Sequence, residues 1–202
     1  MIVKTTYSAL RIAVVLLISC QISKGQDGSI KKLDDASRPQ LNLTYEYQFT
    51  KADSSEGVEK AFKDGKLYVE TFFKNKGEQQ FVKRYSTKTG NLLQSDSVVE
   101  FKKMVGNSTV YYPNGNVKEI THRDTSGEVD MYKGYFEGGG TKVVIAYRDG
   151  KRNGLLTEYN PNGTVKETGR YLNDKREGEF KFFDVRGNLI TKRKFKQDKV
   201  VK

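Results

Sequence analysis

The chain has 202 residues and is basic, with 36 Lys and Arg against 25 Asp and Glu and a formal net charge of +11. Hydrophobic residues make up 36% and include no Trp, which argues against a bulky globular core. A single Cys and a single His exclude a disulfide framework and a Cys/His metal cluster. We therefore expect no enzyme, no catalytic or metal-binding residues and no cofactor, and we expect His122 to be an ordinary surface residue in a turn-rich stretch.

Residues 1–25 have the pattern of an export signal. Lys4 and Arg11 precede or open an apolar run over residues 12–18, which is shorter than the roughly 20 residues that span a bilayer. Cleavage after Gly25 would leave Gln26 as the first residue, whereas cleavage before Cys20 would leave a lipidated cysteine. Either alternative predicts an exported protein that is periplasmic, outer-membrane-associated or extracellular, with no transmembrane helix after processing and a charge lowered to +8.

Residues 26–80 are expected to form a polar arm followed by a degenerate β cap. The segments 44–49 and 66–73 are rich in aromatic and β-branched residues and predict strands. Between them, residues 54–63 predict one or two helical turns or, because of Gly57, a loop. A repeat array needs atypical ends of this kind to shield its terminal core.

A 24-residue period runs through residues 81–202. Segments 112–119, 160–167 and 184–191 are alike and carry Gly115, Gly163 and Gly187, and a weaker copy surrounds Gly139. Such a period is typical of an array of stacked units. The units are 106–129, 130–153, 154–177 and 178–201, with one more degenerate turn near Gly90.

Each unit reads as a β-hairpin whose turn contains one of these four glycines. Asn114-Gly115 and Asn162-Gly163 predict turns in which both central residues have positive φ. The flanking segments alternate as strands do, so the predicted fold is all-β, an elongated antiparallel meander of stacked hairpins. Aromatic residues at equivalent positions form a ladder that is either core or contact surface, and we expect mostly core: Tyr111, Tyr135, Tyr159, Phe183, Tyr147, Tyr171 and Phe195.

Residues 150–171 resemble the bacterial variant of the MORN repeat, the type found in YwqK-family antitoxins, and the resemblance extends over about residues 81–201. It implies an elongated antiparallel sheet used for contact with proteins or membrane surfaces. The chain departs from the commonest pattern because it lacks Trp and because Asp130 stands where a unit usually opens with Gly.

These observations favour an exported, non-enzymatic interaction or scaffold module that binds another protein at the cell envelope. One alternative is a basic surface that binds anionic lipid or polysaccharide through Lys192, Arg193, Lys194 and Lys196. The same lysines could instead be the solvated face of a strand that protects an open edge. Another alternative, implied by the resemblance, is an antitoxin-like binder of a toxin protein. Nucleic acid is not an expected partner, because an exported protein rarely meets it.

Overall fold

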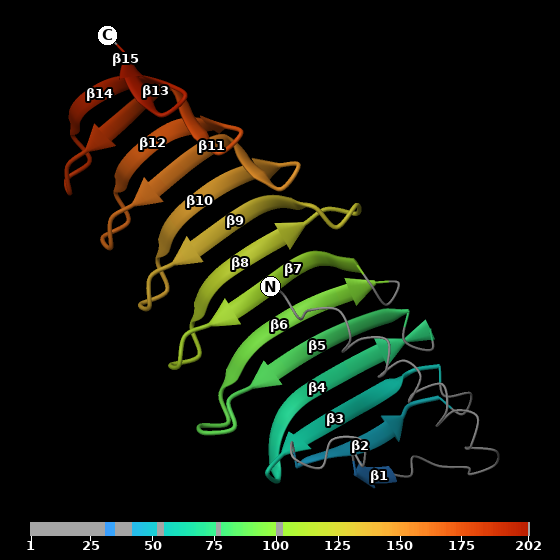
Figure 1. Cartoon of the computed structure of the whole chain (residues 1–202). Coiled ribbons are helices and arrows are strands. Elements are labelled where there is room, and N and C mark those ends of the chain that lie inside the picture. Colours follow the sequence, from blue (N-terminus) through green and yellow to red (C-terminus); the bar gives the residue numbers. More distant parts are fainter. Residues whose placement is uncertain (1–30, 35–41, 52–54, 76–77, 100–102, 202) are drawn as a thin grey trace. The chain divides into compact units, whose positions relative to one another are not determined.

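The computed structural model describes residues 31–34, 42–51, 55–75, 78–99 and 103–201 (Figure 1). The predicted export signal, both of its cleavage positions and Cys20 lie outside the described residues. The chain divides into two compact units, Met1–Met104 and Val105–Lys202. This boundary differs from the predicted division at 80/81, because the strands that follow residue 80 continue the hairpins of the first unit.

The described part of the first unit is built from strands alone. They are β1 (Lys31–Asp34), β2 (Leu43–Phe49), β3 (Gly57–Lys63), β4 (Lys66–Lys74), β5 (Gln79–Tyr85) and β6 (Leu92–Val99). Consecutive strands pair antiparallel. The helical turns or loop predicted for residues 54–63 are wrong, because seven of these residues form β3 between two aromatic-rich strands. The predicted polar arm likewise contains β1.

Gly57 opens β3 for a packing reason that the sequence does not show. A Cβ at this position would lie 2.5 Å from the carbonyl oxygen of Gln48 and 2.8 Å from the Phe73 ring. The buried residues Ala61, Val69 and Val82 then form the apolar cluster of this unit. Gly57 therefore permits close packing of neighbouring strands.

The second unit is an antiparallel meander of nine strands. They are β7 (Lys103–Tyr111), β8 (Val117–Arg123), β9 (Val129–Tyr135), β10 (Thr141–Arg148), β11 (Lys151–Tyr159), β12 (Val165–Leu172), β13 (Lys175–Phe183), β14 (Leu189–Lys196) and β15 (Lys199–Val201). Each strand pairs with the next one along the chain (Figure 1). The predicted all-β meander of hairpins is confirmed.

One edge of this sheet carries four similar loops, which we call the tip loops: 112–116, 136–140, 160–164 and 184–188. In the first, the Tyr112 amide donates to the carbonyl of Asn116 (2.8 Å) and the Gly115 amide donates to the carbonyl of Tyr112 (2.9 Å). The glycines Gly115, Gly139, Gly163 and Gly187 have φ of 89°, 95°, 87° and 89°. A tight turn followed by a glycine in the left-handed region is a three-residue hairpin loop with a bulge.

The prediction that both residues of each Asn-Gly pair have positive φ is wrong. Asn114 and Asn162 are not among the residues with positive φ. The reason is a bulge beside each tip loop, where the strand register shifts between Val110 and Tyr111 and again between Glu158 and Tyr159. The extra residue supplied by the bulge lets glycine alone take the left-handed conformation.

Two-residue turns with both φ values positive lie at the opposite edge. They are Asp149-Gly150 (52° and 69°), Asn173-Asp174 (50° and 67°) and Gln197-Asp198 (53° and 69°). This is the type I′ geometry, whose twist matches that of the strands it joins. The two edges of the sheet therefore use different turns with the same 24-residue period.

Side chains connect each turn to the next turn on the same edge. At the tip-loop edge, Asn116 Nδ2 donates to the carbonyl of Glu137 (2.8 Å), and Asn162 Nδ2 donates to the carbonyl of Val185 (2.7 Å). At the other edge, Asp174 Oδ1 accepts from the Arg152 amide (2.9 Å) and Asp198 Oδ1 from the Arg176 amide (2.8 Å). These hydrogen bonds tie each repeat to its neighbour.

The apolar core of the second unit lies in its last two repeats. Leu156, Tyr171, Phe180 and Phe195 are buried together, and Phe180 is fully buried. The Phe180 ring packs edge-on against Tyr171 (centroids 6.0 Å apart) and Phe195 (5.1 Å). Gly169 makes room for it, since a Cβ there would lie 2.3 Å from the Phe180 ring.

Candidate binding faces of the second unit

The strand register assigns side chains of the second unit to two faces. Residues directly opposite in an antiparallel pair share a face. One continuous row runs through Thr109, Ile120, Lys133, Val144, Thr157, Thr168, Lys181 and Lys192. We call its face the ladder face, and the opposite face, which holds Leu156 and Phe180, the core face.

Four of the seven predicted ladder aromatics lie on the ladder face. Tyr111, Tyr135, Tyr159 and Phe183 each lie two residues beyond a member of the row, beside a tip loop, and each is half-buried. Tyr135 is held in place because its carbonyl accepts a hydrogen bond from the Tyr112 hydroxyl (2.9 Å). These four rings are therefore ordered aromatic groups that stay accessible on one side of the sheet.

The other three predicted ladder residues lie on the core face. Tyr171 and Phe195 belong to the buried cluster, whereas Tyr147 is half-buried. The seven positions thus form two rows on opposite faces of the sheet. The equal spacing in the sequence could not separate them, because the bulges beside the turns change the alternation of side chains.

Two arginines that the sequence analysis did not single out cover the core aromatics. The Arg152 guanidinium lies 4.3 Å from the centroid of the Tyr171 ring, and that of Arg176 lies 5.1 Å from Phe180 and 5.2 Å from Phe195. These are favourable cation–π contacts. The signal available in the sequence was an arginine two residues before Gly154 and again before Gly178.

Glu167 is the buried carboxylate of this region. An Arg176 guanidinium nitrogen lies 3.3 Å from Glu167 Oε1, but Oε1 receives no hydrogen bond of acceptable geometry from the described residues. Burial raises the pKa of Glu167, and the attraction of Arg176 offsets part of this rise. The group is consequently held at a cost when it is ionised.

Lysine side chains gather on the ladder face at the C-terminal end of the unit. Lys181 stands directly opposite Lys192, and Lys196 stands opposite Lys199. Glu179 Oε1 is 3.8 Å from the Lys181 ammonium and 3.5 Å from that of Lys192. We call the lysines on this face the lysine patch: Lys181, Lys192, Lys194, Lys196 and Lys199.

The predicted basic group Lys192, Arg193, Lys194 and Lys196 does not form one surface. Arg193 points to the core face, where its guanidinium lies 5.8 Å from the Phe182 ring. Alternation along β14 is the physical reason, because successive side chains of a strand point to opposite faces. Lys181 and Lys199 were missed because they join the patch through strand pairing.

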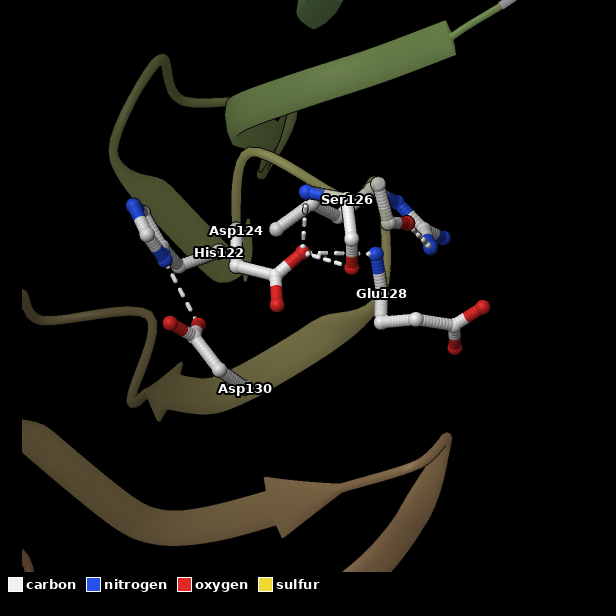
Figure 2. Close-up of polar contacts among 7 residues, drawn as sticks. His122, Asp124, Ser126, Glu128 and Asp130 are labelled. Atoms are coloured by element: carbon white, nitrogen blue, oxygen red, sulfur yellow. Dashed lines mark hydrogen bonds and ion pairs between the residues drawn. The ribbon is translucent and has the colours of Figure 1, made fainter.

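His122 lies in β8 and not in a turn-rich stretch, which corrects the prediction (Figure 2). Its Nδ1 is 2.6 Å from Asp130 Oδ1 across the β8–β9 pair. Ser126 belongs to a separate loop, where its hydroxyl donates to Asp124 Oδ1 (2.5 Å). That hydrogen bond and backbone amides lower the pKa of Asp124. Figure 2 shows two separate polar pairs rather than a Ser–His–Asp relay.

Metal ligands and membrane spans were sought among the described residues. No group of three or more His, Cys, Asp and Glu side chains is arranged there to hold a metal ion. The described part of the chain also contains no helix whose length and apolar character would let it cross a membrane.

Comparison with known proteins gives two kinds of result. No curated protein matches the chain. The solved structures include the crystal structure of TarM, with 12% identity and a TM-score of 0.37 over 80% of this chain and 26% of the other. They also include an S. aureus TarM mutant in complex with fondaparinux, alpha-GlcNAc-glycerol and UDP, with 10% identity and a TM-score of 0.32 over 86% and 32%. The chain spans less than a third of the length of either, and such low similarity carries no argument about function.

The family comparison agrees with the hairpins described above. The family model of the MORN repeat variant matches residues 104–124 and 152–173. The first segment covers β7 and β8, and the second covers β11 and β12. The second match contains Gly154 and Gly169, which the packing of these strands requires. The chain is a MORN-type repeat protein.

Proposed function

We propose that the chain is an exported, non-enzymatic repeat protein that binds another protein at the cell envelope through the ladder face of its second unit. The observation that carries this proposal is the row formed by Tyr111, Tyr135, Tyr159 and Phe183. MORN repeats generally mediate binding to proteins or membrane lipids, which supports a binding role. Capture of a toxin protein by an antitoxin-like binder would be one case of such an interaction.

The four ladder aromatics have the properties of interface anchors. Each is half-buried, so its ring is held by neighbouring strands while part of it stays accessible. Aromatic anchors of this kind carry much of the energy of protein interfaces and lose little entropy on binding. Because each lies two strands from the next, an extended partner segment running across the strands could contact several at a spacing of about 9.5 Å.

Cross-linking in intact cells followed by capture of the full chain tests this proposal. A Tyr135→Ala, Tyr159→Ala variant should lose most of the partner that the wild type recovers, since aromatic anchors often contribute about 2 kcal/mol or more each. The control is Tyr147→Ala, which removes a half-buried tyrosine from the core face. Equal recovery with both variants, each folded by circular dichroism, would remove the ladder face from consideration.

A second candidate is binding of an anionic lipid or polysaccharide, and the lysine patch favours it. Like charges placed directly opposite on neighbouring strands repel each other, as Lys181 and Lys192 do. Glu179 compensates only part of this charge. An anionic surface would relieve the repulsion that remains, so the patch suits such a ligand.

Flotation with phosphatidylglycerol vesicles tests the second candidate. Replacing Lys192, Lys194 and Lys196 by Ser should abolish vesicle binding, and wild-type binding should fall steeply with salt. Arg193→Ser is the control because Arg193 lies on the core face. Binding that survives the triple substitution, or that does not depend on salt, would contradict this role.

A further inference from the structure

A shallow hollow lies in the first unit, where the start of β4 meets the loop between β5 and β6. Its volume is about 360 Å³. This falls within the range of small-molecule sites, although near its lower end. The residues that line it are Lys66, Leu67, Ser86, Thr87, Lys88, Thr89 and Gly90. None of these residues is acidic, and only Leu67 is apolar.

The length of the loop explains why a hollow forms here. The Ser86 amide donates to the carbonyl of Asn91 (2.8 Å), so this loop closes over six residues. The first tip loop of the second unit closes over five, from Tyr112 to Asn116. Extending the pairing of Val69 with Arg84 places Thr87 opposite Lys66. The longer loop therefore leaves space beside the first residue of β4.

The lining offers hydrogen-bond donors and positive charge. Ser86 Oγ accepts from the Thr89 amide (3.2 Å) and Thr89 Oγ1 accepts from the Asn91 amide (3.3 Å). A hydroxyl that accepts one hydrogen bond still has its own proton to donate. Lys66 and Lys88 are exposed, and neither forms an ion pair with another residue in the part of the chain that the structure describes.

The nearest carboxylate in the sequence already has a partner. Asp64 lies two residues before Lys66, and its Oδ1 accepts a hydrogen bond from Asn42 Nδ2 (2.9 Å). The hollow therefore combines two cationic side chains with three hydroxyl groups. Lysine ammonium groups together with hydroxyl donors are suited to phosphate and sulfate oxygens.

We propose that this hollow binds the phosphate or sulfate group of a small anionic ligand. Lys66 and Lys88 supply the charge, while the Ser86, Thr87 and Thr89 hydroxyls donate to the oxygens. The site lies in the first unit, so it goes beyond the binding proposed for the ladder face. Its test can fail or succeed independently of that proposal.

Nuclear magnetic resonance titration of the ¹⁵N-labelled full chain tests the site. Sodium phosphate and sodium sulfate are added separately at constant ionic strength, with sodium chloride as the reference. We expect saturable shifts of the Thr87, Lys88 and Gly90 amides with phosphate, sulfate or both, and none with chloride. The two arms distinguish a phosphate site from a sulfate site.

Substitutions then assign the charge. The Lys66→Ser, Lys88→Ser variant should weaken binding by about tenfold or more, because it removes both charge-assisted contacts. The control replaces Lys118 and Lys142, two exposed lysines of the second unit, by Ser and should leave the affinity unchanged. If the double variant does not fold, Lys88→Ser alone in the loop replaces it. Shifts that do not saturate, or that persist equally in the variant, would overturn the proposal.

Discussion

Gly138 and Gly139 are neighbours in one tip loop and differ in backbone conformation. Both have open space where a Cβ would lie, but only Gly139 has a positive φ, 95°. Gly139→Ala should therefore cost about 1–2 kcal/mol, since a Cβ clashes with its own backbone in the left-handed region. Gly138→Ala should be neutral or slightly stabilising because it lowers the entropy of the unfolded chain.

Urea unfolding of the two alanine variants measures this difference. The two sites share the same loop and the same exposure, so the comparison isolates φ as the variable. Equal losses of stability would show that the tip loop tolerates side chains for a different reason. The same argument predicts a comparable loss for Gly163→Ala, whose φ is 87° and whose Cβ would also meet open space.

Glu167 makes stability depend on pH. Burial raises its pKa above the ordinary 4.5, so the native state holds the proton more tightly than the unfolded state does. The contribution of Glu167 to stability is therefore greatest below its unfolded pKa and falls as the pH rises through its native pKa. Relative to Glu167→Gln, the wild type should lose stability between pH 4.5 and about pH 7.

Chemical unfolding of both proteins at the two pH values checks this sign. The difference in unfolding free energy between wild type and Glu167→Gln is the quantity to compare, since it cancels the other titrating groups. A difference that stays constant, or that grows in favour of the wild type as the pH rises, would contradict the assigned cause. The second result would mean that attraction to Arg176 outweighs burial.

At the scale of the hairpin, the fit between Gly169 and Phe180 is the most sensitive contact. A Cβ on Gly169 would lie 2.3 Å from a ring that is fully buried. Gly169→Ala should therefore destabilise the protein by about 1–3 kcal/mol through overpacking. Adding Phe180→Leu should recover part of that loss, because the smaller side chain vacates the space.

A double-mutant cycle in urea separates this contact from general damage. The two substitutions should be less destabilising together than the sum of their separate effects, as expected for residues in contact. Additive effects would show that the ring moves away without strain. Gly134→Ala offers a graded comparison, since its Cβ would meet Val143 at 3.0 Å.

The hairpin scale also shows what the sequence predicted and what it could not. The 24-residue period, the turn glycines and the strand composition predicted the antiparallel hairpins of the second unit. The turn type was wrong at Asn114 and Asn162, because the dipeptide alone does not reveal a bulge in the adjoining strand. Gly57 was read as favouring a loop, although it permits close packing with Phe73.

The candidate binding faces were predictable only in part, for the same reason. Equal spacing identified the aromatic positions, but strand pairing decided that Tyr159 and Tyr171 point to opposite faces. Likewise, a run of basic residues predicted a patch, but alternation placed Arg193 away from it. Contacts between distant strands, such as Lys181 with Lys192, are set by register and leave no local signal.

For the second unit as a whole, burial is unevenly distributed. Its buried apolar cluster belongs to β11, β12, β13 and β14, whereas among the described residues of β7–β9 only Gly134 is buried. Local opening should therefore cost less in β7–β9. Amide hydrogen exchange should be at least about tenfold slower in β11–β13, a difference of about 1.4 kcal/mol.

Hydrogen-exchange mass spectrometry on the full chain measures this gradient. Overlapping peptides that cover β7–β9 and β11–β13 are compared under native conditions. Uniform protection across all of these strands would show that the unit opens as one cooperative block. Repeat arrays allow either behaviour, because stability is shared between each repeat and its interfaces with its neighbours.

The hydrogen bonds between successive turns also restrict how such a chain can change in length. Asn162 reaches a carbonyl 23 residues further on, and Asp174 accepts from an amide 22 residues earlier, each on its own edge. Inserting a whole 24-residue repeat preserves both distances and both edges. Inserting a single strand of about 12 residues would exchange the edges, so that a tip loop faced a two-residue turn with no matching partner. Duplication and loss are therefore tolerated in steps of one complete hairpin.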